Sequence, residues 1–232
     1  MRKTLLSLFL GLAGCSAWAQ GTVVLQNANA SYLLSTNAAL IGQGIGVTAK
    51  TPALAFDYAV LIANYGGPVP SSNPLDAAWS GAVLTGVNFA VIAGGISGQG
   101  GSAGAAVAGW GAPTGPQYTD GTEKYFMIVG WSSNMGTTWG TVSADLASGW
   151  ATLPEGKAFF GESAIGYGFA GGGPFSLPAP SLWGVSSAMP GGLTSGFTLV
   201  VSPEPSTFAL TGLGGLALLL LRRSRRMHRN GE

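Results

Sequence analysis

The sequence predicts a mainly β protein whose body, residues 20–202, forms an antiparallel β-sandwich. Glycine occurs 39 times among 232 residues, more than twice its usual share of about 7%. Charged residues make up only 8% of the chain, far below the roughly 25% of ordinary soluble domains. Short apolar runs recur between glycine-rich breaks, which is typical of short strands joined by turns. These observations together favour a strand-rich body with few helices.

Each expected strand is an apolar or aromatic run between turn-forming residues. The run Tyr125–Trp131 is the clearest, because it is continuous and bounded on both sides by turn residues. We expect strands at Thr22–Gln26, Ala55–Asn64, Gly86–Ile92, Ala103–Trp110, Lys124–Ser132, Trp139–Asp145, Lys157–Ile165 and Phe197–Val201.

Other parts of the chain are expected to be loops or helices. The glycine-rich stretch 94–101 and the glycine- and proline-rich stretch 171–180 are predicted loops. For residues 141–150 a short helix is the alternative to a strand, because Val142, Leu146 and Trp150 recur at helical spacing.

The first 19 residues have the three parts of a secretory signal peptide, which we expect to be helical. A positive start is followed by the apolar residues 5–12, and Ala17-Trp18-Ala19 forms an A-x-A motif before Gln20. We therefore expect cleavage between Ala19 and Gln20.

Cys15, the only cysteine of the chain, offers a second interpretation of this end. Leu12-Ala13-Gly14-Cys15 also fits the lipobox of bacterial lipoproteins, in which the cysteine is lipidated and becomes the first residue. Cleavage after Ala19 is preferred, because a lipid anchor would duplicate the anchor expected at the C-terminus.

Residues 203–229 form a distinct C-terminal segment, and residues 230–232 a short tail. Pro203-Glu204-Pro205 interrupts regular structure, and the apolar run 206–221 follows it as a predicted transmembrane helix. These 16 residues make about 24 Å of helix, whereas the hydrocarbon core of a bilayer is about 30 Å thick. The basic cluster that comes next is expected in the cytoplasm by the positive-inside rule; it contains Arg222, Arg223, Arg225 and Arg226.

The proline-glutamate-proline motif, the short apolar helix and the terminal arginines, in this order, resemble the PEP-CTERM sorting signal of Gram-negative bacteria. The resemblance covers about the last 30 residues of the chain. It implies recognition by an exosortase, a membrane-embedded processing protease that cuts near the motif. It further implies a transient stay in the inner membrane, followed by delivery to the cell surface or an extracellular matrix.

The body itself shows few groups that could carry chemistry. It has three lysines and seven acidic residues, a net charge of −4, and this excludes a basic surface for nucleic acid. The only histidine, His228, lies in the tail, so Ser163 in Gly161-Glu-Ser163-Ala-Ile165 has no histidine base. We expect no catalytic residues, no metal site and no cofactor, and we expect that the protein is not an enzyme.

Tryptophan is the one enrichment in the body with functional potential. Six of the seven tryptophans lie there, and they are expected mainly in the core. Trp79 and Trp183 lie in loop-like surroundings, where an exposed indole can act as a platform for a sugar ring. The leading hypothesis is thus an exported surface or matrix protein of unknown specific role, and the alternative is a carbohydrate-binding module for exopolysaccharide.

Overall fold

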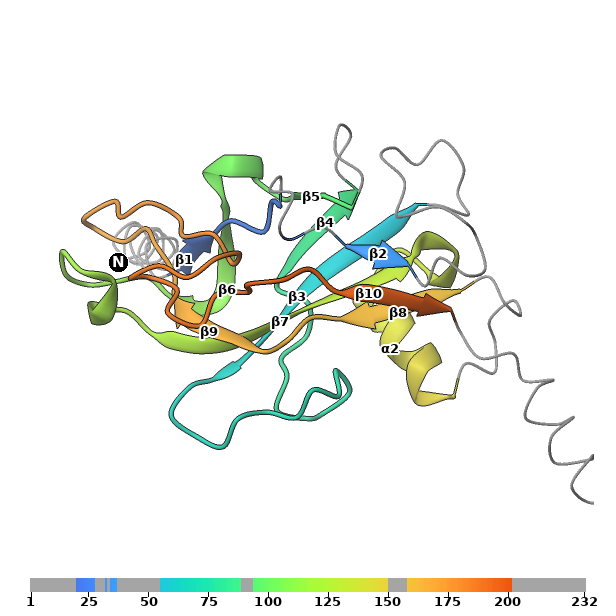
Figure 1. The fold of residues 1–232 in the computed structure, drawn as a ribbon. Coiled ribbons are helices and arrows are strands. Elements are labelled where there is room, and N and C mark those ends of the chain that lie inside the picture. Colours follow the sequence, from blue (N-terminus) through green and yellow to red (C-terminus); the bar gives the residue numbers. More distant parts are fainter. Residues whose placement is uncertain are drawn as a thin grey trace, which may run out of the picture.

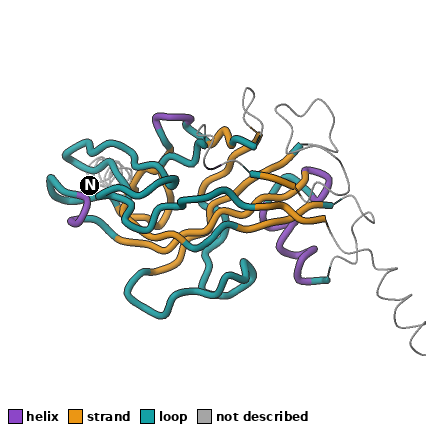
Figure 2. Tube along the Cα trace, viewed as in Figure 1, coloured by secondary structure: helices purple, strands orange, loops and turns teal. Residues whose placement is uncertain are grey.

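The computed structural model describes residues 20–27, 32, 34–36, 55–88, 94–149 and 158–201. Over these residues the protein is mainly β with antiparallel sheets, which confirms the predicted fold class at that level (Figures 1 and 2). The predicted signal-peptide helix and transmembrane helix lie outside the described residues. No helix within the described ranges is long and apolar enough to cross a membrane.

The main sheet has eight strands and is built around its two longest, β3 (Phe56–Asn64) and β7 (Glu123–Ser132). These two pair antiparallel along their whole length, from Phe56 opposite Ser132 to Asn64 opposite Lys124. The strand order is β2-β10-β8-β7-β3-β4-β5, and β9 pairs with β7 beside β8. The remaining strands of this sheet are β2 (Ser35–Thr36), β4 (Leu84–Asn88), β5 (Ile96–Gly98), β8 (Phe159–Glu162), β9 (Gly166–Phe169) and β10 (Thr198–Val201).

The central strands form because their residues are apolar on both faces, so that both sides of the sheet can be covered. One face carries a large core that includes Tyr58, Val60 and Ile128. It is covered by the two-stranded ribbon of β1 (Gln20–Val23) and β6 (Ala105–Gly111) and by segments between residues 170 and 197. The second layer on this face is therefore a ribbon with loop segments rather than a sheet as wide as the first.

The other face carries a second core, made from the alternate residues of the same strands. It is covered by α2 (Trp139–Ala147), by η5 (Ser133–Met135) and by the loop after β3, which brings in Trp79. Figure 1 shows α2 and this loop beneath the sheet and β1 and β6 above it.

The segment 139–147 corrects one of the expected strands. Trp139–Asp145 was a predicted strand, but these residues belong to α2. Thr138 caps the helix by accepting a hydrogen bond from the backbone N–H of Thr141 at 3.3 Å. Because Trp139 and Val142 lie on one helical face, both side chains reach the core.

The seven other expected strands all overlap observed strands. Their ends differ by a few residues where both ends are described, whereas residues 89–92 and 157 of two expected strands lie outside the described residues. The sequence did not indicate β2, β5 or β9. β5 falls inside the predicted loop 94–101, and the pair β2 and β10 is parallel, unlike the other strand pairs described. The stretch 171–180 is a loop as expected, apart from isolated bridges at Gly171, Gly172 and Leu177.

Candidate functional site

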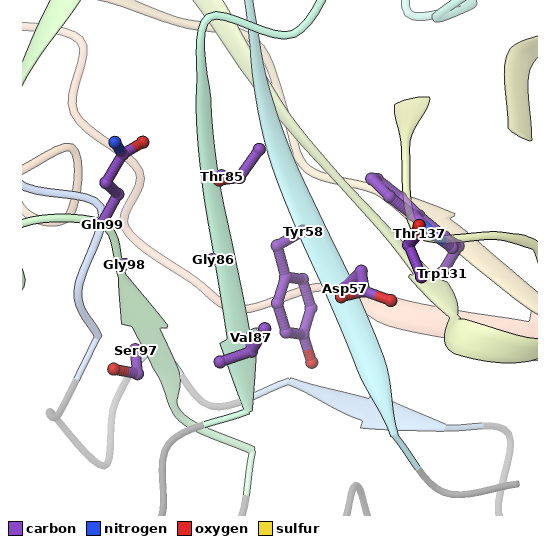
Figure 3. Close-up of a pocket in the computed structure, with 10 residues that line it drawn as sticks. All are labelled: Asp57, Tyr58, Thr85, Gly86, Val87, Ser97, Gly98, Gln99, Trp131 and Thr137. Atoms are coloured by element: carbon purple, nitrogen blue, oxygen red, sulfur yellow. The ribbon is translucent and has the colours of Figure 1, made fainter. Parts of the chain in front are cut away.

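An open groove lies where β3, β4 and β5 leave the cover of α2 and η5, with a volume of about 310 Å³ (Figure 3). Its floor is one row of directly opposed residues on three strands. Asp57 on β3 is opposite Val87 on β4, and Val87 is opposite Ser97 on β5. Trp131, the partner of Asp57 on β7, extends the row on the other side and is almost fully buried. We call this feature the Asp57 groove.

Polar side chains surround the apolar centre of the groove. Val87 is 52% exposed at the middle of the floor. Thr85 comes from the next position on the same face of β4, and Gln99 follows β5, with its backbone N–H bonded to the Thr85 carbonyl at 2.9 Å. Thr137, from the link between η5 and α2, forms part of the wall beside Trp131. The lining thus offers a carboxylate, hydroxyls and an amide around an exposed aliphatic side chain.

Among the described residues that line the groove, Asp57 is the only charged one. Its Oδ2 accepts a hydrogen bond from the Ser133 hydroxyl at 2.7 Å, so one side of the carboxylate is fixed. Burial raises the pKa of Asp57 above its ordinary value of 3.8, and the Ser133 hydrogen bond lowers it by a smaller amount. The carboxylate is therefore held in place, and desolvation is the larger influence on it.

Trp131 supports the wall of the groove without being accessible itself. Its indole N–H donates to the Gly136 carbonyl at 2.8 Å, which ties η5 to the end of β7. Its ring lies 6.0 Å from that of Trp139 on α2. These contacts fix the position of the neighbouring Thr137 link.

The predicted exposure of Trp79 and Trp183 is wrong. Trp79 is only 8% exposed and Trp183 only 6%. The Trp79 indole N–H donates to the Ser71 carbonyl at 3.0 Å, and that of Trp183 donates to the Leu25 carbonyl at 2.9 Å. Both indoles are thus packed into the core, and each indole N–H donates to a backbone carbonyl, since a large aromatic side chain in a loop is still mostly buried.

Ser163, the serine of the nucleophile-like motif, is also buried. Its Oγ accepts a hydrogen bond from the backbone N–H of Ile128 at 2.9 Å and donates to the Ala164 carbonyl at 2.7 Å. The side chain replaces a missing strand partner at the gap between β8 and β9. These two hydrogen bonds give the Ser163 hydroxyl a structural role in the sheet.

Three tyrosines meet at the opposite end of the same sheet face. The ring of Tyr65 lies 4.8 Å from that of Tyr125 and 5.4 Å from that of Tyr167. Glu123 nearby raises the pKa of Tyr65 by charge repulsion, and burial raises the pKa of Glu123 itself. Tyr65 and Tyr167 stack on each other, so the three rings pack mainly against one another.

Most residues of the predicted terminal sites lie outside the described part of the chain. This holds for Cys15, Ala17, Ala19, the motif Pro203-Glu204-Pro205 and the arginine cluster. Gln20 is described: it is the first residue of β1, opposite Gly111 of β6. Within the described residues, no three histidine, cysteine or acidic side chains are grouped as metal ligands would be.

The Asp57 groove was not anticipated from the sequence. Its floor depends on the register of β3, β4 and β5, and the sequence predicts a loop over the residues of β5. One signal was present, since Asp57 is the single charged residue in the otherwise apolar run of β3.

No match was found to a protein-family model, a curated protein or a solved structure. The likeness of the tail to a sorting signal therefore depends on its own residues alone.

Proposed function

We propose that this chain is an exported cell-surface or extracellular-matrix protein, processed at both ends of a folded β body. The observation that carries the proposal is a coincidence of boundaries. The first described strand begins at Gln20, directly after the predicted cleavage motif, and the last described strand ends at Val201, two residues before Pro203. Removal of both terminal signals would leave every described strand intact.

The N-terminal strand supports cleavage close to Gln20. Val23 on β1 is fully buried, and Gly21 and Thr22 pair with Val107 and Ala106 of β6. At Gly21 a Cβ atom would lie 2.2 Å from the Cβ of Ala170, so the strand packs tightly from its second residue. A signal peptidase that cuts before Gln20 therefore keeps the whole of β1 in the mature protein. Lipidation at Cys15 would also preserve β1, with residues 16–19 as a tether.

The C-terminal strand sets a matching limit on the other cut. β10 lies between β2 and β8, and its Leu199 is fully buried in the larger core. Val200 and Val201 pair with Phe160 and Phe159 of β8. A cut within β10 would remove this strand from the interior of the sheet, whereas a cut at Pro203-Glu204-Pro205 would not. In this proposal the exosortase releases the body from the inner membrane at the motif.

We assign no catalytic role to the body. Its one serine motif is engaged in the hydrogen bonds of Ser163 within the sheet. The tail accounts for the location of the protein, and the body supplies the stable part that is delivered there.

Replacement of Pro203, Glu204 and Pro205 by alanine tests the sorting proposal. We expect the variant to accumulate uncut in the inner membrane, as measured by immunoblotting of membrane and extracellular fractions. Ser206→Ala, directly beside the motif, is the matched control and should be processed like the natural chain. If the triple variant is cut and released at the natural rate, the sorting proposal is wrong.

Binding of exopolysaccharide is the second candidate function. Trp79 and Trp183 are too buried to serve as sugar platforms. What favours this candidate is the Asp57 groove, because it is an open surface that combines an aliphatic centre with hydroxyl, amide and carboxylate groups.

A further inference from the structure

We infer that the Asp57 groove is a binding site for a short segment of neutral polysaccharide. This inference deepens the second candidate function and is independent of the sorting proposal. It rests on the composition of the groove, on the pairing of its strands and on the chemistry that each possible ligand would need.

The size and layout of the groove suit a small extended ligand. Its volume of about 310 Å³ is near the lower end of ligand sites, which span roughly 300–1,000 Å³. Asp57, Val87 and Ser97 stand in one row on three adjacent strands, so the row is about 10 Å long at the usual strand spacing. A row of this length fits a short saccharide better than a single ion.

The lining matches the two sides of a sugar ring. A pyranose presents C–H groups on its faces and hydroxyl groups around its edge. The half-exposed Val87 can pack against the C–H groups, while the hydroxyls of Thr85 and Ser97 both donate and accept hydrogen bonds. Asp57 accepts only, and Ser133 occupies its Oδ2, so Oδ1 is left for a sugar hydroxyl.

Charged ligands fit this lining poorly. None of the described residues that line the groove is a lysine or an arginine, so an anionic polymer would meet the Asp57 carboxylate without a compensating cation from these residues. Asp57 is also the only carboxylate among the described lining residues, and within the described part of the chain no three histidine, cysteine or acidic side chains are grouped as metal ligands would be. A neutral ligand therefore remains the best match.

An added peptide strand also fits poorly. β4 is already paired on both sides, by β3 and by β5. The other edge of β5, away from β4, is already paired at Ile96. The Ile96 backbone N–H donates to the Asn27 carbonyl at 3.2 Å, and the Ile96 carbonyl accepts from the Asn27 N–H at 3.0 Å. A ligand must therefore bind to side chains on the sheet face rather than extend the strand ladder.

Two exposed valines provide a matched pair of variants. Val87 in the groove is 52% exposed, and Val200 on β10 is 51% exposed. Val87→Arg would fill the groove with a long side chain, and Val200→Arg would place the same side chain on an exposed strand of the same sheet. Asp57→Asn keeps the shape and the acceptor for Ser133 but removes the charge-assisted bond to the ligand.

The test is affinity electrophoresis of the full chain in native gels containing dextran, xylan, glucomannan or alginate. A detergent without a sugar headgroup avoids competition for the groove. We expect retardation in at least one of the three neutral polymers and none in the anionic alginate. Val87→Arg should abolish it, Val200→Arg should retain it, and Asp57→Asn should weaken binding by about tenfold or more.

Three results would overturn the inference. The first is free migration in all three neutral polymers. The second is retardation that Val87→Arg and Val200→Arg reduce equally. The third is retardation in alginate alone. Each leaves the sorting proposal untouched, because processing at the tail is measured separately.

Discussion

Ser163 and Ile128 are joined by two hydrogen bonds, one of which uses a side chain in place of the backbone. The Ser163 N–H donates to the Ile128 carbonyl at 2.8 Å, and the Ile128 N–H donates to the Ser163 Oγ at 2.9 Å. This pairing bridges the gap between β8 and β9, which share the same side of β7. The Ser163 hydroxyl thus supplies a hydrogen-bond acceptor for the Ile128 N–H of β7 at the point where the paired strand changes from β8 to β9.

Ser163→Ala is expected to destabilise the protein by about 1–3 kcal/mol, because it leaves the buried Ile128 N–H without a partner. Urea denaturation monitored by tryptophan fluorescence measures the effect. Ser143→Ala is the control, since among the described residues the Ser143 hydroxyl donates only to the Gly140 carbonyl, in an exposed hydrogen bond of α2. Equal stability of the Ser163 variant and the natural protein would show that the hydroxyl is dispensable.

Trp183→Phe and Trp110→Phe are expected to differ, although both indoles are buried in the same core. Trp183 donates to the Leu25 carbonyl, whereas the indole N–H of Trp110 has no hydrogen-bond partner among the described residues. Trp183→Phe therefore leaves a buried carbonyl unsatisfied, at a cost of about 1–3 kcal/mol in addition to lost packing. Trp110→Phe removes an unsatisfied donor and should cost less. Thermal unfolding of the two variants would contradict this if Trp110→Phe lowered the melting temperature more.

Leu199→Ala and Val200→Ala test the contribution of β10 to the body. Leu199 is fully buried, and Val200 is exposed on the opposite face of the strand. Leu199→Ala should cost about 2–5 kcal/mol, and Val200→Ala should stay within about 0.5 kcal/mol of the natural protein. Limited proteolysis reports the same difference, with faster digestion of the Leu199 variant. Similar losses in both variants would mean that β10 does not pack as described.

Asp57→Asn should increase stability at neutral pH. Burial raises the folded-state pKa of Asp57 above its ordinary value of 3.8, so the folded protein holds this proton more tightly than the unfolded chain does. The free energy of unfolding therefore falls as the pH rises from the unfolded-state pKa through the folded-state pKa of Asp57. Above both pKa values this loss of stability stays constant.

The asparagine keeps an acceptor for Ser133 and removes this cost. The stability difference between the variant and the natural protein should be small at pH 3, grow through the acidic range and level off toward pH 7. Denaturation curves at these pH values measure it. A variant that is less stable at pH 7 than at pH 3, relative to the natural protein, would reverse the predicted sign.

The central strands could be predicted from the sequence because they are covered on both faces. Burial on both sides requires the continuous apolar runs of β3 and β7. Runs of this length between turn residues indicate strands clearly. Segment 139–147 was harder, because Trp139, Val142 and Leu146 fit a helix while the same stretch is apolar enough for a strand. The threonine cap at Thr138 was the local signal in favour of the helix.

The short glycine-containing strands could not be predicted, because what makes them possible is contact with distant residues. In β9 a Cβ atom at Gly166 would lie 2.3 Å from the Phe126 ring, so only glycine allows this strand to approach β7. In sequence the same glycine indicates a turn. The Asp57 groove was hidden for a related reason, since the register of three strands brings its residues together.

Identification of the first and last residues of the mature protein by mass spectrometry tests the central claim most directly. Mass spectrometry of the protein recovered from the surface or matrix fraction should find Gln20 as the first residue. The C-terminus should lie beyond Val201, at or near Pro203-Glu204-Pro205, with the apolar segment and the arginines removed. A mature chain that begins at a lipidated Cys15 would mean that the N-terminus is a lipobox and that the predicted cleavage between Ala19 and Gln20 is wrong. An intact C-terminus at Glu232, or a cut inside β10, would contradict the proposal that the folded body is released at this motif.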